Sequence, residues 1–200
     1  PDTRLWESRA EMSMFTDVFF WALVAALCLY AGVVIFTSRT RFARPVYMLA
    51  GIAASLGYIG PRVLIPFLPQ PSLGVPAAVA WPLGGVLLAL GLGIMGRAIA
   101  RLRANARNRA AEAQAPILTD GLFALVRHPM YLGDVLWSLG LALALDAGYA
   151  LLLVPVWWGL RAGLAVFEEE RLADKYADAY TAYRAQVPDR ILPNPRRILG

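Results

Sequence analysis

The sequence is poor in cysteine, histidine and charge. Its single cysteine, Cys28, lies within an apolar run, which excludes a disulfide framework and a cysteine-based zinc site, and we expect no metal. Charged residues make up only 16% of the 200-residue chain and hydrophobic residues make up 58%, whereas a soluble domain typically carries about 25% charge. The mean hydropathy is +0.53. The composition therefore excludes an ordinary soluble domain and predicts an integral membrane protein.

Long apolar runs predict an all-α fold, a polytopic membrane helix bundle with about five transmembrane helices in a single domain. Gly57, Gly60 and Pro61 interrupt the second run, and we expect a kink near Pro61 rather than an end, because neighbouring helices satisfy the freed backbone groups. Glycines in the third run predict close packing at the centre of the bundle. The expected spans are residues 18–36, 46–68, 77–99, 129–145 and 149–167.

Arginines are concentrated at the ends of these runs. Segments 39–44 and 97–109 carry eight arginines, whereas the connections at 61–75 and 146–148 carry only Arg62. The positive-inside rule then places the N-terminus outside and the C-terminus in the cytoplasm, and we expect a bacterial inner-membrane protein. The net charge of +5 also suits nucleic acid, but the arginine distribution favours membrane orientation, so no nucleic-acid partner is expected. A mixed-charge start before a long apolar run predicts no cleavable signal peptide.

The stretch from Arg127 to Asp134 reads Arg-His-Pro-Met-Tyr-Leu-Gly-Asp and contains the only histidine of the sequence. Proline suits the first turn of a helix, so a helix starting near Pro129 would hold Arg127 and His128 at its positive end. A helix start with a cation beside it is a site for an anionic group. Asp134 would lie inside a span, where an acid is expected to have a partner. A lone histidine beside an apolar helix is often a structural residue, and that alternative stays open.

A second polar stretch, beginning with three consecutive glutamates at 168–170, follows the fifth expected span. Spacings of four, four, four and three residues predict one helix face that contains Glu168, Leu172, Tyr176, Tyr180 and Tyr183. Tyrosines at a membrane surface are usually an interfacial belt. The glutamates are either solvated acids or ligands for a ribose hydroxyl, an amine or a cation.

Together the two stretches resemble the isoprenylcysteine carboxyl methyltransferase family of integral-membrane methyltransferases, which is related to the phospholipid methyltransferases. The resemblance rests on the Arg-His-Pro-Met-Tyr-Leu-Gly motif, on the later Glu-Glu pair with its leucine and tyrosines, and on Val187-Pro188. It covers residues 115–193, the expected cofactor-binding methyltransferase core, and leaves 1–110 as scaffold spans. It implies S-adenosyl-L-methionine in a cytosol-facing pocket roofed by a C-terminal cytosolic helix. The implied substrate is a lipophilic acceptor that enters from the bilayer lipids: an isoprenylcysteine-like carboxylate, a lipid, or a small thiol or amine.

The resemblance and the expected helix start together assign a set of cofactor-binding residues. Arg127 and His128 would hold the methionine carboxylate through charge-assisted hydrogen bonds. Glu168 would accept hydrogen bonds from ribose hydroxyls or the amino group, and Tyr131 and Phe123 would enclose the adenine or the sulfonium. The full set is Asn108, Ala115, Pro116, Ile117, Leu118, Phe123, Arg127, His128, Pro129, Met130, Tyr131 and Glu168.

The chain departs from the family pattern in three places. Leu122-Phe123-Ala124 stands in place of Pro-Tyr-Arg, and Tyr176-Ala177 stands in place of Phe-Gly. Leu164 occupies the position where eukaryotic members have an arginine for the substrate carboxylate. Arg161 lies two helical turns before Glu168 on the same face, so we assign Arg161 as a catalytic substitute for that arginine.

An acceptor that must lose a proton also needs a base. The candidates are Glu169, which we assign as catalytic, together with His128 and Asp134. An ionised carboxylate acceptor needs no base.

Two alternatives to a methyltransferase remain at this level. A membrane sterol-reductase family has a similar C-terminal architecture, and Gly133-Asp134 with the segment 187–191 resembles it. Such an oxidoreductase would use NADPH, although no glycine-rich dinucleotide motif follows a predicted strand. A non-enzymatic membrane protein is the other alternative. A transporter usually shows internal repeats and charges at the membrane midplane, and the sequence shows neither.

Overall fold

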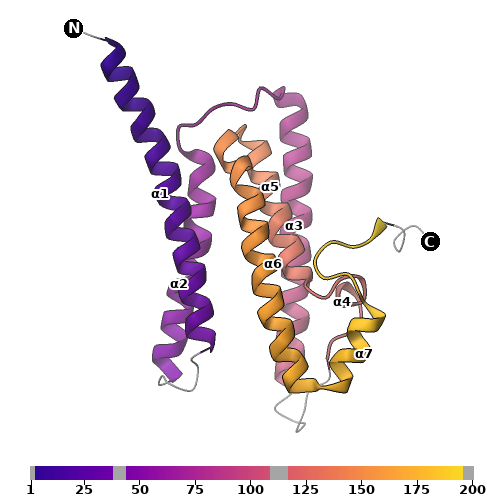
Figure 1. Cartoon of the computed structure of the whole chain (residues 1–200). Helices are drawn as coiled ribbons and strands as arrows, with labels where there is room; N and C mark the ends of the chain where they lie inside the picture. Colours follow the sequence, from indigo (N-terminus) through magenta and orange to yellow (C-terminus); the bar gives the residue numbers. More distant parts are fainter. Residues whose placement is uncertain (1–2, 38–43, 109–116, 196–200) are drawn as a thin grey trace. The chain divides into compact units, whose positions relative to one another are not determined.

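The computed structural model of the chain describes residues 3–37, 44–108 and 117–195. The described chain is helical and contains no strand, which confirms the all-α prediction (Figure 1). A short 3₁₀ turn, Ile65–Phe67, follows the second helix. The α-helices are α1 (Thr3–Thr37), α2 (Arg44–Leu64), α3 (Ala77–Asn108), α4 (Leu122–Leu125), α5 (Pro129–Ala144), α6 (Gly148–Tyr176) and α7 (Asp178–Gln186).

Four segments of these helices are long and apolar enough to cross a membrane by length and composition. The four are Val18–Ile35, Pro45–Phe67, Ala77–Arg107 and Gly148–Tyr176, and the shorter apolar helix α5 is a fifth candidate. Large apolar side chains on them are exposed, for example Leu23 (57%), Leu56 (66%) and Leu152 (71%). Exposed leucines on long apolar helices suit contact with lipid tails, so the chain is a membrane protein.

Several helices extend beyond the expected spans, and α3 continues to Asn108. Helix α1 begins at Thr3 instead of residue 18, and α6 continues to Tyr176, since neither polar extension contains a helix-breaking residue. Pro61 lies inside α2, as predicted, and does not end it. A one-turn helix, α4, lies between α3 and α5.

The chain divides into two compact units, which are described separately. In the first, Pro1–Gly85 with Leu141–Val154, α1 packs along α2. The two helices meet closely at Gly57, where an added Cβ would lie 2.4 Å from the Cys28 sulfur. Cys28 therefore acts as a small packing residue in this seam. The turn before α6 is fixed by Asp146, whose carboxylate accepts hydrogen bonds from the Ser72 hydroxyl and, at 2.8 Å, from the Leu73 amide.

The second unit, Val86–Gly140 with Pro155–Gly200, contains the two polar stretches. Here α3 and α5 cross with their backbones in contact. An added Cβ at Gly91 would lie 2.4 Å from the Trp137 amide nitrogen, and one at Gly133 would lie 2.6 Å from the Gly91 carbonyl oxygen. On α6, Ala165 packs against Tyr131 and Ile191. The glycine crossing thus fixes the helix that carries Tyr131 and Asp134.

We expect Gly91→Ala to lower the free energy of unfolding by about 1–3 kcal/mol, because the new methyl group would overlap backbone atoms that move only with a whole helix. Thermal unfolding in detergent micelles measures the loss. Gly93→Ala, on the same helix, is the matched control, since a Cβ there meets nothing within 4 Å. Equal melting temperatures for the two variants would contradict the close crossing.

Candidate functional site

The single histidine lies at the start of α5, as the sequence predicts. Helix α5 begins at Pro129, and the His128 carbonyl accepts hydrogen bonds from the amides of Tyr131 (3.0 Å) and Leu132 (3.3 Å). The backbone before the helix is extended and bonds to a segment near the C-terminus. The Arg127 amide donates to the Asp189 carbonyl at 3.0 Å, and the His128 amide donates to the Arg190 carbonyl at 2.8 Å. We call residues 187–191 the C-terminal strap.

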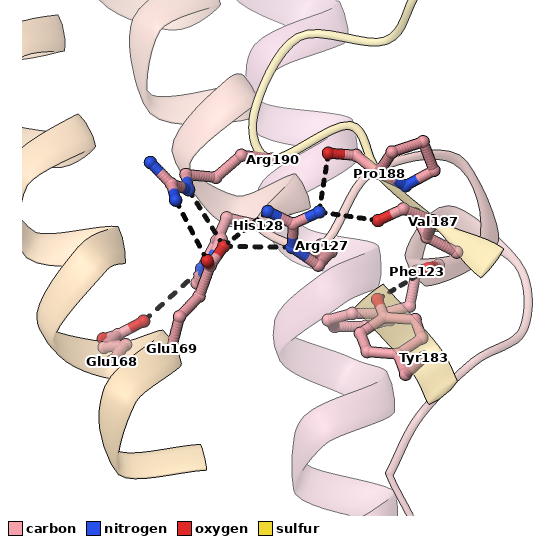
Figure 2. A network of polar contacts seen from close by, with 9 residues as sticks. All are labelled: Phe123, Arg127, His128, Glu168, Glu169, Tyr183, Val187, Pro188 and Arg190. Atoms are coloured by element: carbon pink, nitrogen blue, oxygen red, sulfur yellow. Dashed lines mark hydrogen bonds and ion pairs between the residues drawn. The ribbon is translucent and has the colours of Figure 1, made fainter. Parts of the chain in front are cut away.

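The carboxylate of Glu169 lies at the centre of the site (Figure 2). It accepts hydrogen bonds from the Arg127 Nε at 3.0 Å and from two nitrogens of Arg190 at 3.0 and 3.1 Å. The His128 Nε2 lies 3.2 Å from the same carboxylate. Glu169 is only 4% exposed, and a buried carboxylate is stable only when it is paired and hydrogen-bonded. Glu169 is thus the common partner of α5, α6 and the strap.

Arg127 is committed to protein acceptors. Besides Glu169, its Nη1 donates to the carbonyl oxygens of Val187 (2.7 Å) and Pro188 (2.6 Å), and its side chain is only 6% exposed. The guanidinium therefore clamps the strap onto the start of α5. This arrangement differs from the sequence expectation that Arg127 holds a cofactor carboxylate.

Glu168, in contrast, is accessible. Its side chain is 39% exposed, and its Oε2 lies 3.5 Å from the His128 Nδ1. The His128 ring also stacks on Tyr131, with centroids 5.3 Å apart and planes 8° from parallel. The imidazole is therefore placed between the buried and the exposed glutamate (Figure 2). An exposed carboxylate beside a fixed histidine can accept hydrogen bonds from hydroxyl or ammonium groups of a ligand.

A second ion pair joins α5 to α6 farther from the strap. The Arg161 Nε lies 2.9 Å from the Asp134 Oδ2, and the Trp137 Nε1 donates to the Asp134 Oδ1 at 3.0 Å. The Arg161 guanidinium also covers the Tyr131 ring at 4.9 Å. The prediction that Asp134 has a partner is confirmed. Arg161, which the sequence analysis assigned to the substrate, has this carboxylate as its counter-ion.

The tyrosines after the glutamates do not share one helix face. Helix α6 ends at Tyr176, and Ala177 has φ +44°, so α7 starts in a new direction and the prediction of a continuous face is wrong. Tyr180 and Tyr183 are 1% and 4% exposed and pack with Val187, so the interfacial-belt alternative is wrong for this pair. The Tyr183 hydroxyl donates to the Phe123 carbonyl at 2.7 Å, which ties α7 to α4 (Figure 2).

The remaining predicted cofactor residues are only partly described. Phe123 and Pro129 are buried, and Ile117, Leu118 and Met130 are half-buried. Ala115 and Pro116 lie outside the described residues. Asn108 ends α3, and its side chain is also outside the description.

The turn before α4 is held at Asp120, whose carboxylate pairs with Arg101 of α3. The hydrogen bond from Arg101 holds the pKa of Asp120 below its usual range. Ile117, three residues before Asp120, packs against Tyr180, Tyr183 and Val187.

Sequence reasoning missed Arg190 as a site residue. Its side chain is 39% exposed while two of its nitrogens bond Glu169. The only signal was its place after Val187-Pro188-Asp189, in the strap-forming segment. Nothing local in the sequence indicates that this arginine folds back on a glutamate 21 residues earlier.

Comparisons with known proteins match the part of the chain that carries much of this site. A family model described as phospholipid methyltransferase matches residues 79–179, which include His128 and Glu168. A protein-S-isoprenylcysteine O-methyltransferase of Schizosaccharomyces pombe is 37% identical over 76 residues, 38% of this chain and 32% of that protein. Protein-S-isoprenylcysteine O-methyltransferase B of Arabidopsis thaliana is 27% identical over 150 residues, 72% of this chain and 73% of the relative. The alignment thus spans about a third of the yeast protein, and no solved structure matches the chain.

We expect Glu169→Gln to destabilise the protein by about 3–5 kcal/mol, because it leaves Arg127 and Arg190 without their shared counter-charge. Thermal unfolding and protease cleavage within the strap measure the effect. Glu170→Gln is the control, since Glu170 is exposed on the same helix turn. A strap that resists protease equally in both variants would contradict the clamp.

Because the Tyr183 hydroxyl is buried, we expect the free energy of unfolding to fall at high pH. Burial raises the pKa of Tyr183 to about 12, compared with about 10 in an unfolded chain. The folded state holds this proton more tightly, so the contribution is complete below about pH 10 and is lost as the pH rises towards 12. Melting temperatures between pH 8 and pH 11 should fall less steeply for Tyr183→Phe than for the parent. Parallel curves would be the contrary result.

Proposed function

The chain belongs to the phospholipid methyltransferase family, and on that basis we propose that it is an integral-membrane methyltransferase that uses S-adenosyl-L-methionine and a lipophilic acceptor. The family resemblance inferred from the two motifs is confirmed, because the matched residues include the first motif and the second motif as far as Tyr176. The observation that carries the proposal is the contact between the motifs: His128, at the start of α5, lies against both Glu168 and Glu169 of α6. We take residues 115–193 as the core that binds the methyl donor.

The residues at this site suit the methyl donor. Its amino-acid end carries one ammonium and one carboxylate, and the site offers a half-exposed carboxylate, Glu168, and a half-exposed guanidinium, Arg190. Glu168 accepts hydrogen bonds from the ammonium or the ribose hydroxyls. Arg190 takes the carboxylate, the part that the sequence analysis gave to Arg127. The apolar Ile117, Leu118 and Met130 suit the adenine.

The acceptor enters from the bilayer beside α6. Phe167, directly before Glu168, is 61% exposed, and Val166 is 38% exposed, so an apolar surface leads to the acid. With the arginine-rich segments in the cytoplasm, the strap and Glu168 face the cytosol, where the donor is supplied. A lipid chain can therefore stay in the membrane while its polar end reaches the site.

The protein contributes mainly by positioning the donor and the acceptor, and less by activating them chemically. The donor supplies a methyl group already activated on a sulfonium, and aligning two bound reactants can contribute ~7–11 kcal/mol in favourable cases. Tyr131 and His128 stack to form one fixed wall, and the strap excludes water from it. Glu169 positions Arg127, Arg190 and His128 rather than serving as the general base, because its oxygens are already bonded. His128 is the group placed to move a proton.

The charges at the site disfavour the reductase alternative. A nicotinamide dinucleotide carries several phosphates and needs unbalanced cations, whereas Arg127 and Arg190 both already pair with the Glu169 carboxylate. The single carboxylate at the methionine end of S-adenosyl-L-methionine needs fewer cations.

We expect the purified protein to bind S-adenosylmethionine saturably by calorimetry, and to show no binding of NADPH in parallel. Glu168→Gln and His128→Ala should each weaken binding by roughly tenfold or more, because each removes a hydrogen-bonding group at the donor site. Glu170→Gln is the matched control and should leave the affinity unchanged. Unchanged donor affinity in both site variants would sink the assignment, and binding of NADPH alone would move the protein to the reductase class.

A further inference from the structure

The Asp134–Arg161 pair lies on the apolar side of the site and has no part in the donor site described above. Asp134 is 2% exposed and its partner's side chain is 16% exposed. Arg161 lies seven residues before Glu168 on α6, roughly 10 Å along the helix axis. It contacts the Tyr131 ring, which in turn stacks on His128. The pair therefore lies where the polar end of an acceptor approaches from the membrane.

The charges of this pair cancel. Asp134 holds the Arg161 guanidinium through Oδ2, and Trp137 fixes the other carboxylate oxygen, so the acid cannot turn away without losing a second bond. An incoming carboxylate would leave water and find a cation that is already neutralised. It would also meet the negative charge of Glu168 on the same helix. In an apolar setting an ionised group without a counter-charge is strongly disfavoured.

We propose that Asp134 determines the charge class of the acceptor by neutralising Arg161, so that the site favours lipophilic acceptors with an uncharged nucleophile over ionised carboxylates. This inference rests on the proposed function. In the transfer, the lone pair of the amine or thiol forms the new bond to the methyl carbon. The carbon–sulfur bond of the donor breaks, its electron pair stays on sulfur, and the acceptor's proton passes to His128 and from there to water.

The test is a comparison of two ligands that differ in charge and by one methyl group. N-acetyl-S-farnesylcysteine carries a carboxylate at neutral pH, and its methyl ester is uncharged. Both ligands partition into detergent, which changes their apparent dissociation constants. This effect cancels when the ratio of the two constants is compared between variants in the same detergent. Calorimetry on the full chain gives the ratio without any need for turnover.

In the parent protein we expect the acid to bind no more tightly than the ester. Asp134→Asn frees the Arg161 charge, and the acid should gain on the order of tenfold relative to the ester. Ser138→Ala is the matched control, because Ser138 is buried on the same helix and its hydroxyl donates to the backbone carbonyl of Asp134. Its acid-to-ester ratio should equal that of the parent.

The double variant Asp134→Asn/Arg161→Gln keeps the test decisive if the single variant does not fold. It removes both charges, so the acid-to-ester ratio should stay within about threefold of the parent, since a neutral pair is replaced by a neutral pair. If Arg161 instead binds the acceptor carboxylate, the parent prefers the acid and the double variant loses that preference. That result would overturn the proposal.

Donor binding separates the two proposals. Arg161 contacts the donor cluster through the face of Tyr131, whose ring is also held by its stacking on His128, so all variants should still bind S-adenosylmethionine. Two results would overturn this inference alone, provided that the donor still binds. One is an unchanged acid-to-ester ratio in Asp134→Asn, and the other is no saturable binding of either ligand. A parent protein that does not bind the donor overturns the proposed function.

Discussion

The site depends on one buried carboxylate. Glu169 is 4% exposed, and its two oxygens are the shared acceptors for Arg127, Arg190 and His128. Taking a carboxylate out of water is costly unless cations and hydrogen bonds replace the lost solvent, so this residue forces three segments together. They are the start of α5, the end of α6 and the C-terminal strap. The positions of Glu168 and the His128 ring follow from that assembly.

The membrane-spanning helices serve this assembly through their backbones. The approach of Gly91 and Gly133 brings α3 and α5 into backbone contact, which needs glycine on both sides. Two residues before Gly133 is Tyr131, and the next residue is Asp134. The crossing therefore fixes where Tyr131 and Asp134, and with them the aromatic wall and the second ion pair, lie relative to α3. Packing between helices determines where the polar groups meet.

The sequence predicted what depends on local pattern. Long apolar runs gave the helices, and proline at a first turn gave the start of α5 at Pro129. The tertiary contacts could not be predicted from local pattern. The left-handed backbone at Ala177 breaks a face that spacing alone makes continuous, and alanine carries no signal for such a turn. The shared partner of Arg190 and Arg127 could not be predicted for another reason, since only the folded strap brings both arginines to Glu169.

The charged groups of the described site differ in exposure. In the proposed function, this difference distinguishes the donor end of the site from the acceptor end. Arg127 and Glu169 are buried against protein partners, whereas Glu168 and Arg190 keep 39% of their side chains exposed. One exposed acid and one exposed guanidinium match a zwitterion, the form of the amino-acid end of the proposed donor. On the apolar side, Asp134 and Arg161 cancel each other before any ligand arrives. In the proposed reaction, a site with exposed groups of both signs at one end and a closed ion pair at the other suits a zwitterionic donor end and an uncharged acceptor, because each ligand then meets groups that match its own charge.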